Sequence, residues 1–515
     1  MLVKTFGSAI YGVDAITISV EVDVNNQGKN YFIVGLPDNA IKESLQRVES
    51  AIKSNRYYMP RTKLLVNLAP ADIKKTGTAF DLPIAIGTLA ATGQLDNPEK
   101  LLDYVIMGEL SLDGNIKPIK GALPIAMQAK KDDFHGLIIP IANAKEAAMV
   151  SDLNVYGVSH LNEVVAFLKN SDSIQPTFMD SSLEFSQAQT NDEVDFSDVK
   201  GQQNIKRALE IAAAGGHNAI LIGPPGAGKT MLAKRIPTIL PPLSLDEALE
   251  TTKIHSVAGK LSENATIICR RPFRSPHHTI SDVALVGGGG HPQPGEISLS
   301  HNGVLFLDEL PEFKRTVLEV MRQPMEERKV TISRAKVAID FPASFMLIAS
   351  MNPCPCGYFN HPEKECTCGP GMVQKYLNKV SGPLLDRIDL HVEVTPVAFD
   401  ALSNNENAEK SENIRQRVIA ARNIQAKRYK NQSTIFSNAQ MSSKHLKELC
   451  MLDDVGKKLL KTAIEKLNLS ARAYDRILKV SKTIADLEGS DHIKTAHLAE
   501  AIQFRSLDRE HWGFS

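Results

Sequence analysis

Hydrophobic and polar residues alternate near the start of the chain and then change period. ITISVEVDV (16–24) and YFIVGL (31–36) alternate apolar and polar positions, which predicts two strands. DNAIKESLQRVESAIKSN (38–55) instead spaces its apolar residues three or four apart, which predicts a helix capped by Asp38. We therefore expect residues 1–168 to form a mixed α/β domain.

The pattern changes twice further along. Residues 169–198 contain seven acidic residues and one basic residue with little periodicity, which indicates a linker. Residues 199–395 alternate apolar runs (AILIG, GVLFLDE, SFMLIAS) with helical segments, as open α/β sheets do. After a polar break at 396–412, the Leu-, Ala- and Lys-rich remainder predicts a helical domain within 396–515.

Composition narrows the class of protein. Lys and Arg total 59 and Asp and Glu total 59 in 515 residues, which excludes a uniformly basic nucleic-acid coat and a polybasic membrane binder but not a local basic channel. No apolar run approaches the ~18 residues of a membrane span, and the N-terminus lacks the pattern of a secretory signal. Six cysteines are too few for a disulfide scaffold. We expect a soluble, cytoplasmic protein with no membrane partner.

The segment GPPGAGKT (223–230) matches G-x-x-x-x-G-K-[ST] between a predicted strand and a predicted helix. Backbone N–H groups of such a loop surround the phosphates of ATP, its lysine lies by the β- and γ-phosphates, and its hydroxyl binds Mg²⁺. The ATP-binding residues that it predicts are Gly223, Pro224, Pro225, Gly226, Ala227, Gly228, Lys229 and Thr230.

Carboxylates follow the next apolar strand, VLFL (304–307). We expect Asp308 to hold Mg²⁺ together with Thr230, and Glu309 to orient or deprotonate the attacking water. Asn352 ends the strand after that and is placed to hold the same water. The roles of two arginines stay open at this point. Arg387, in SGPLLDRIDL (381–390), forms either an ion pair within the chain or an arginine finger, and Arg472 either contacts nucleotide or lies on a helix surface.

Cys354, Cys356, Cys366 and Cys368 form C-x-C-x₉-C-x-C. Four thiolates in two close pairs suit a tetrahedral, structural Zn²⁺. Four free thiols, or His361 in place of one cysteine, are the alternatives.

These motifs, in this order, resemble those of AAA+ ATPases of the magnesium-chelatase-like group, which is similar to the replicative MCM helicases. RPFRSPHHTISDVALVGGG (271–289), NPCPCGY (352–358) and ILKVSKTIADLEG (477–489) are most similar to the bacterial ComM/YifB family, over essentially the whole chain. The resemblance implies an AAA+ core with a helical lid in a ring that is usually a hexamer. It also implies Asn352 as sensor 1, Arg387 as a finger acting in trans and Arg472 as sensor 2.

Two insertions resemble pore elements of this group. Residues 326–341 read as strand, turn and strand and resemble the presensor-1 hairpin, with Arg334 and Lys336 near the turn. Residues 270–290, with Arg271 and Arg274, resemble the helix-2 insert. We expect these four side chains to bind DNA, with solvated charged loops as the alternative.

Residues 1–168 resemble the Lon-protease-like fold through KKTGTAFDLPIAIG (74–87) and GELSLDGNIKPIKGALPIAMQAKK (108–131). Ala79 and Leu123 occupy the positions of the protease's serine and lysine, so we expect no peptidase activity. The resulting hypothesis is an ATP-driven, hexameric helicase that promotes branch migration of branched DNA in natural transformation. The alternative is a magnesium-chelatase-like ATPase that remodels a partner protein, against which the Lon-like domain and the four cysteines argue.

Overall fold

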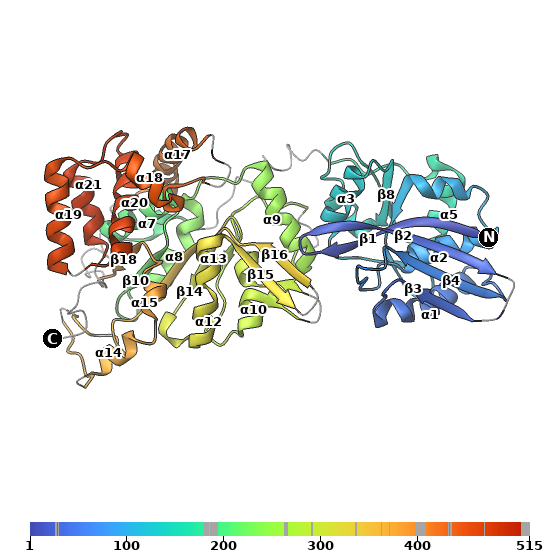
Figure 1. Cartoon of the computed structure of the whole chain (residues 1–515), viewed down its shortest axis with the longest axis horizontal. Coiled ribbons are helices and arrows are strands. Elements are labelled where there is room, and N and C mark those ends of the chain that lie inside the picture. Colours follow the sequence, from blue (N-terminus) through green and yellow to red (C-terminus); the bar gives the residue numbers. More distant parts are fainter. Residues whose placement is uncertain are drawn as a thin grey trace. The chain divides into compact units, whose positions relative to one another are not determined.

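The computed structural model divides the chain into two compact units (Figure 1). The first unit comprises Met1–Ala188 and Leu245–Cys269, and the second comprises Gln189–Ser244 and Arg270–Ser515. The structure describes residues 1–25, 28, 30–179, 185, 194–261, 266–289, 292–334, 337–361, 363–369, 371–396, 408–430, 432, 435–467 and 469–505, without the side chains of 334 and 337. Residues 180–184 and 186–193 of the expected linker and residues 397–407 of the polar break lie outside these residues.

A seven-stranded mixed sheet is the frame of the first unit. Its strand order is β3-β4-β2-β1-β5-β8-β9, antiparallel between β1, β2 and β4 and parallel elsewhere. The alternation predicted for 16–24 is confirmed, because alternate residues of β2 are buried. The strands are β1 (Leu2–Tyr11), β2 (Asp14–Asn25), β3 (Tyr31–Val34), β4 (Lys63–Ala69), β5 (Tyr104–Ile106), β8 (Gly136–Pro140) and β9 (Asn154–Val158), with a small ribbon of β6 (Glu109–Leu110) and β7 (Ile116–Lys117).

Helices of this unit begin where their sequences indicate. The cap predicted at Asp38 is confirmed: its carboxylate accepts a hydrogen bond from the N–H of Ile41 at 2.9 Å. The second helix is buried along its whole length, and its Asp81 pairs with Arg47 at 2.7 Å. The helices are α1 (Asn39–Ser54), α2 (Asp81–Ala91), α3 (Ala122–Lys131), α4 (Ile141–Ala147), α5 (Leu161–Lys169) and α9 (Leu245–Ala258).

The positions of a Lon-type dyad hold apolar side chains. Leu123 is buried in the core, and Ala79 packs against a hydrophobic cluster. The nearby Lys75 is also buried, but its ammonium group donates to the carbonyl oxygens of Gly35, at 3.1 Å, and Pro70. This lysine therefore has a structural role rather than that of a general base.

A parallel five-stranded sheet organises the second unit, in the order β11-β14-β17-β10-β18. Its central strands are apolar and buried throughout, as expected for a parallel sheet covered on both faces. The strands are β10 (Ala219–Ile222), β11 (Phe273–Arg274), β14 (Val304–Leu307), β17 (Met346–Met351) and β18 (Leu390–Glu393), with the ribbons β12 (Gly287–Gly288)–β13 (Gln293–Pro294) and β15 (Lys329–Arg334)–β16 (Val337–Pro342). A mixed α/β fold with a parallel sheet is thus confirmed.

Helices surround this sheet and form a helical region at the C-terminal end of the unit (Figure 1). Both α17 and α20 pack on α7, which joins the helical region to the sheet layer. The helices are α7 (Gln203–Gly215), α8 (Lys229–Ile239), α10 (Asp282–Val286), α11 (Glu296–Leu299), α12 (Arg315–Val320), α13 (Arg322–Glu327), α14 (Met372–Leu377), α15 (Gly382–Leu385), α17 (Ser411–Arg428), α18 (Ser443–Leu449), α19 (Asp454–Leu467), α20 (Ala471–Leu487) and α21 (Thr495–Gln503). Among the described residues, none of the helices is long and apolar enough to cross a membrane.

One segment departs from the expected domain boundaries. Residues 245–269 interrupt the range 199–395 and belong to the first unit, where α9 packs on α3. Lys253 pairs with Asp14 at 2.5 Å, and the Ser256 hydroxyl hydrogen-bonds the Glu146 carboxylate. The sequence pattern of a helix does not specify which body covers its buried face.

Candidate functional site

Three neighbouring strands of the parallel sheet deliver the predicted site residues to one edge. β10 lies between β17 and β18, and β14 pairs with β17. All of them are parallel, so their carboxyl ends meet at the same edge of the sheet. The loop 223–230 follows β10, Asp308 and Glu309 follow β14, and Asn352 follows β17.

The loop after β10 has the backbone geometry of a phosphate-binding loop. Gly226 and Gly228 have positive φ angles of 79° and 84°, and a Cβ on Gly226 would meet open space. A Cβ on Gly223 would lie 2.3 Å from the carbonyl oxygen of Val394, so only glycine fits there. The loop leads directly into α8, whose first residue is Lys229. The open concave loop at a helix start fits a polyphosphate.

Lys229 lies at the centre of the site. Its ammonium group donates to the carbonyl oxygens of Gly223 (2.7 Å) and Pro224 (2.9 Å) and to Oδ1 of Asn352 (3.1 Å). Burial lowers the pKa of Lys229, while the nearby Asp308 and Glu309 act in the opposite direction. The predicted sensor residue and the loop lysine are therefore in direct contact.

The carboxylate of Asp308 accepts two hydrogen bonds. One comes from Thr230, the other predicted magnesium ligand, and the other from Ser350, which we did not predict to belong to the site. Thr230 Oγ1 donates to Asp308 Oδ2 at 2.7 Å, an arrangement of hydroxyl and carboxylate that fits a shared Mg²⁺. The hydroxyl of Ser350 donates to Oδ1 of Asp308. Ser350 is fully buried, and the signal that could have found it is that it is the one polar residue of β17.

The backbone at Glu309 has a left-handed conformation, with a φ angle of 54°. Its carboxylate lies 3.5 Å from Nδ1 of His278, and the side chain of Glu309 is 58% exposed. The sequence offered no role for the histidine pair at 277–278. The structure places His278 beside the residue predicted to activate water, and the rings of His277 and His278 are tilted by 33° with their centroids 4.1 Å apart.

Both arginines predicted near the nucleotide have partners in their own chain. Arg387 pairs with Glu326 at 2.9 Å and is 11% exposed. Arg472 pairs with Asp386 at 3.1 Å and is 62% exposed. As it stands in this structure, Arg387 forms the ion pair within the chain that was its alternative, and Arg472 lies exposed on the surface of α20.

Arg271 and Arg274 also bind within the chain. Arg271 donates to the backbone carbonyl oxygens of Pro241 (2.6 Å) and Asn302 (2.7 Å). Arg274 forms a two-bond ion pair with Glu296, at 2.6 and 2.7 Å. Both arginines thus have partners within the chain, and their contacts with DNA stay a prediction. The sequence alone does not show whether two opposite charges in one segment, such as those of Arg274 and Glu296, form an ion pair.

The second insertion has the predicted strand-turn-strand form. β15 and β16 pair antiparallel, with Ile332 opposite Ile339 and Arg334 opposite Val337. The helix α13 extends over the first residues of the expected hairpin, so the hairpin begins at Lys329. Lys336 and the side chain of Arg334 lie outside the described residues.

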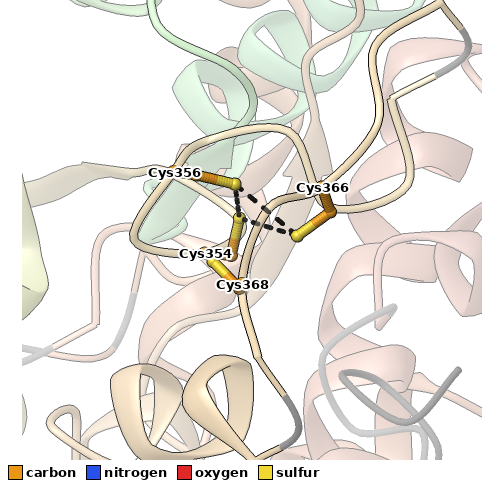
Figure 2. A group of neighbouring side chains, drawn as sticks. All are labelled: Cys354, Cys356, Cys366 and Cys368. Atoms are coloured by element: carbon orange, nitrogen blue, oxygen red, sulfur yellow. Dashed lines mark hydrogen bonds between the residues drawn. The ribbon is translucent and has the colours of Figure 1, made fainter.

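Four cysteine side chains point toward one another between two loops (Figure 2). The Sγ atoms of Cys354 lie 3.3 Å from Cys356 and 3.7 Å from Cys366, and all four Sγ atoms lie within 4.8 Å of one another. A tetrahedral zinc with bonds of about 2.3 Å requires sulfur atoms about 3.8 Å apart, so the cluster fits zinc. Among the described residues this cluster contains cysteines only, without His361.

The cysteine loop also lies against the phosphate-binding loop. Gly357 has a φ of 85°, and a Cβ there would lie 2.5 Å from Cδ of Pro225. The cysteine loop thus begins two residues after Asn352 and approaches the phosphate-binding loop at Gly357.

Sequence models of magnesium-chelatase families match most of the chain. The model described as "Magnesium chelatase, subunit ChlI" matches residues 195–402, and "Magnesium chelatase, subunit ChlI C-terminal" matches 408–505. A third, "Subunit ChlI of Mg-chelatase", matches residues 20–143. This last match removes one argument against the chelatase alternative, because the N-terminal domain does not set the chain apart from that family.

Individual relatives extend over the whole chain. "Competence protein ComM" of Haemophilus influenzae is 44% identical over 512 residues, which covers 99% of this chain and 98% of the relative. YifB of Escherichia coli is 43% identical over 503 residues, covering 97% and 96%. The "Magnesium-chelatase 38 kDa subunit" of Rhodobacter capsulatus is 24% identical over 185 residues, covering 32% and 52%.

Proposed function

Because this chain belongs to the ComM/YifB family of magnesium-chelatase-like AAA+ ATPases, we propose that it is an ATP-driven motor that promotes branch migration of branched DNA during recombination in natural transformation. In this proposal the chains assemble into a hexameric ring in the cytoplasm, and ATP is hydrolysed at the interfaces between subunits.

The observation that carries the ATPase part is the convergence of Lys229, Asp308 and Asn352 at three adjacent strand ends. Bound ATP would supply the phosphoanhydride bond that is hydrolysed, and Mg²⁺ would neutralise part of the charge on its phosphates. Lys229 would turn from the loop carbonyl oxygens toward the phosphates, and Thr230 and Asp308 would hold the metal. Glu309 would take the proton of the attacking water, with His278 beside its carboxylate.

Two residues would complete the site around the γ-phosphate. Asn352 would orient the water or the γ-phosphate once Lys229 releases it. Arg387 would reach the ATP of a neighbouring subunit, and Arg472 would act as sensor 2. Both roles rest on the family resemblance.

The DNA part has separate support. The relative named for competence matches the chain along nearly its entire length. The hairpin β15–β16 supports it further, because it has the strand-turn-strand form of the pore hairpin that it resembles. The net charge of zero requires that DNA contacts be local, such as Arg334 and Lys336 at the turn.

Zinc is proposed as a structural cofactor of the four cysteines. Their separations fit a tetrahedral ion with no open coordination position. The ion would fix the loop that follows Asn352 and touches Pro225.

Remodelling of a partner protein is the second candidate function. Three magnesium-chelatase models match the chain, which favours it. The two functions differ in the polymer that stimulates ATP hydrolysis.

The test is the rate of ATP hydrolysis without nucleic acid, with single strands, with duplex and with a four-way junction. Salt is held fixed, because binding through phosphates depends steeply on it. Glu309→Gln is the blank. Stimulation by DNA, greatest with the junction, is expected. Normal basal hydrolysis that no DNA stimulates would instead support the protein-remodelling function.

A further inference from the structure

The proposed finger Arg387 is restrained inside its own subunit. Its Nη2 lies 2.9 Å from Oε1 of Glu326, and its Nη1 donates to the carbonyl oxygen of Pro383 at 2.6 Å. These are the two terminal nitrogen atoms through which an arginine forms bidentate hydrogen bonds to a phosphate. A guanidinium in this arrangement, 11% exposed, is not available to a neighbouring subunit.

Its partner Glu326 lies at the base of the hairpin β15–β16. Glu326 lies in the last turn of α13, which packs on β15, and only two residues separate it from Lys329, where β15 begins. Arg328 between them has a positive φ of 58° and donates from Nη1 to the carbonyl oxygen of Phe345 at 2.9 Å. The base of the hairpin is therefore hydrogen-bonded to the segment that enters β17, the strand that Asn352 follows.

We propose that Glu326 is a positioning residue that holds Arg387 away from the neighbouring ATP until the hairpin moves. This inference rests on the proposed function, in which Arg387 acts in trans and the hairpin contacts DNA. The carboxylate is 54% exposed, so the ion pair is weak enough for a small displacement of α13 to break it. In this proposal Arg387 has two states, paired with Glu326 or released from it, and DNA bound to the hairpin favours the released state.

The adjacent glutamate provides a matched control. Glu327 lies in the same last turn, is exposed and accepts a hydrogen bond from Gln323 at 2.8 Å. We expect Glu326→Gln to raise ATP hydrolysis in the absence of DNA about two- to fivefold, and to lower the stimulation by DNA by the same factor. Glu327→Gln should match the wild type in both. Equal behaviour of the two variants, or a basal rate of Glu326→Gln below the wild type, overturns the proposal.

A mixing experiment shows whether the released arginine acts on the neighbour. The wild type is mixed with subunits that carry Glu309→Gln alone or Glu309→Gln with Glu326→Gln. Neither kind of added subunit hydrolyses ATP. The double variant should raise the rate of its wild-type neighbours above that seen with the single variant. Equal rates in the two mixtures overturn the proposal.

Arg387→Ala separates this inference from the function beneath it. A variant that binds ATP and assembles but does not hydrolyse supports the finger role, whatever Glu326 does. Wild-type hydrolysis by Arg387→Ala refutes the finger role and the restraint together. Lost hydrolysis in Arg387→Ala combined with identical Glu326→Gln and Glu327→Gln variants refutes only the restraint.

Discussion

At the scale of single residues, the motifs located the chemistry but not the contacts that tune it. Lys229, Thr230, Asp308 and Asn352 meet as the motif spacing predicted, because each follows a strand of one parallel sheet. Ser350 did not stand out, because one serine has no spacing to detect, and the histidine pair at 277–278 was visible but its role was not. Their roles depend on strand register and on a loop that returns to the site.

Ser350 yields the first prediction. Its buried hydroxyl holds one carboxylate oxygen of Asp308, so Ser350→Ala should leave a proposed magnesium ligand less well oriented. We expect the Mg²⁺ concentration for half-maximal hydrolysis to rise about tenfold. Ser481→Ala is the control, because that serine is also buried but donates to a helix carbonyl at 2.8 Å. An unchanged Mg²⁺ requirement in Ser350→Ala would contradict this role.

Lys479, on α20, gives a prediction about pH. Burial and the cation of Arg476 lower its pKa from 10.5 to about 8, although Asp389 acts in the opposite direction. Between these two values the unfolded chain binds more protons than the folded chain, so the free energy of unfolding rises with pH. Lys479→Met should remove that rise, and its Tm relative to the wild type should fall by roughly 4 °C from pH 8 to pH 10.5.

Lys457→Met serves as the comparison, because Lys457 is 66% exposed. Its Tm relative to the wild type should stay constant over the same pH range. A constant difference for Lys479→Met as well would show that burial does not shift this amine.

At the scale of elements, periodicity and capping identified the helices and strands but not their packing partners. The helix that starts after Asp38 and the apolar strands of the parallel sheet follow from local pattern. The assignment of α9 to the first unit does not, because it depends on which surface meets its buried face. The partners of Arg271 and Arg274 within the chain could not be predicted for the same reason, since they are a carbonyl oxygen and a carboxylate that lie far away in the sequence.

The cysteine loop gives a prediction at this scale. We expect about one zinc per chain by elemental mass spectrometry, and Cys366→Ser should lose it. Loss of zinc should also weaken ATP binding, since this loop touches Pro225 of the phosphate-binding loop. Cys450→Ala, a buried cysteine remote from the cluster in sequence, should keep the zinc. Four freely titrating thiols in the native wild type would exclude a bound metal.

At the scale of the whole molecule, the proposed function couples ATP hydrolysis to movement along DNA. In the proposed function the second unit supplies all of the hydrolysis site except Arg387 of another subunit, and the proposed restraint by Glu326 connects Arg387 to the hairpin. A motor built in this way hydrolyses ATP productively only when the ring and the DNA are both present.

The most direct measurement follows a synthetic four-way junction with homologous arms as it resolves into duplexes. Wild-type protein with ATP should move the branch point, and Glu309→Gln should bind the junction without moving it. Hydrolysis that is stimulated by the junction while the branch point stays in place, or equal movement with Glu309→Gln, would contradict the account.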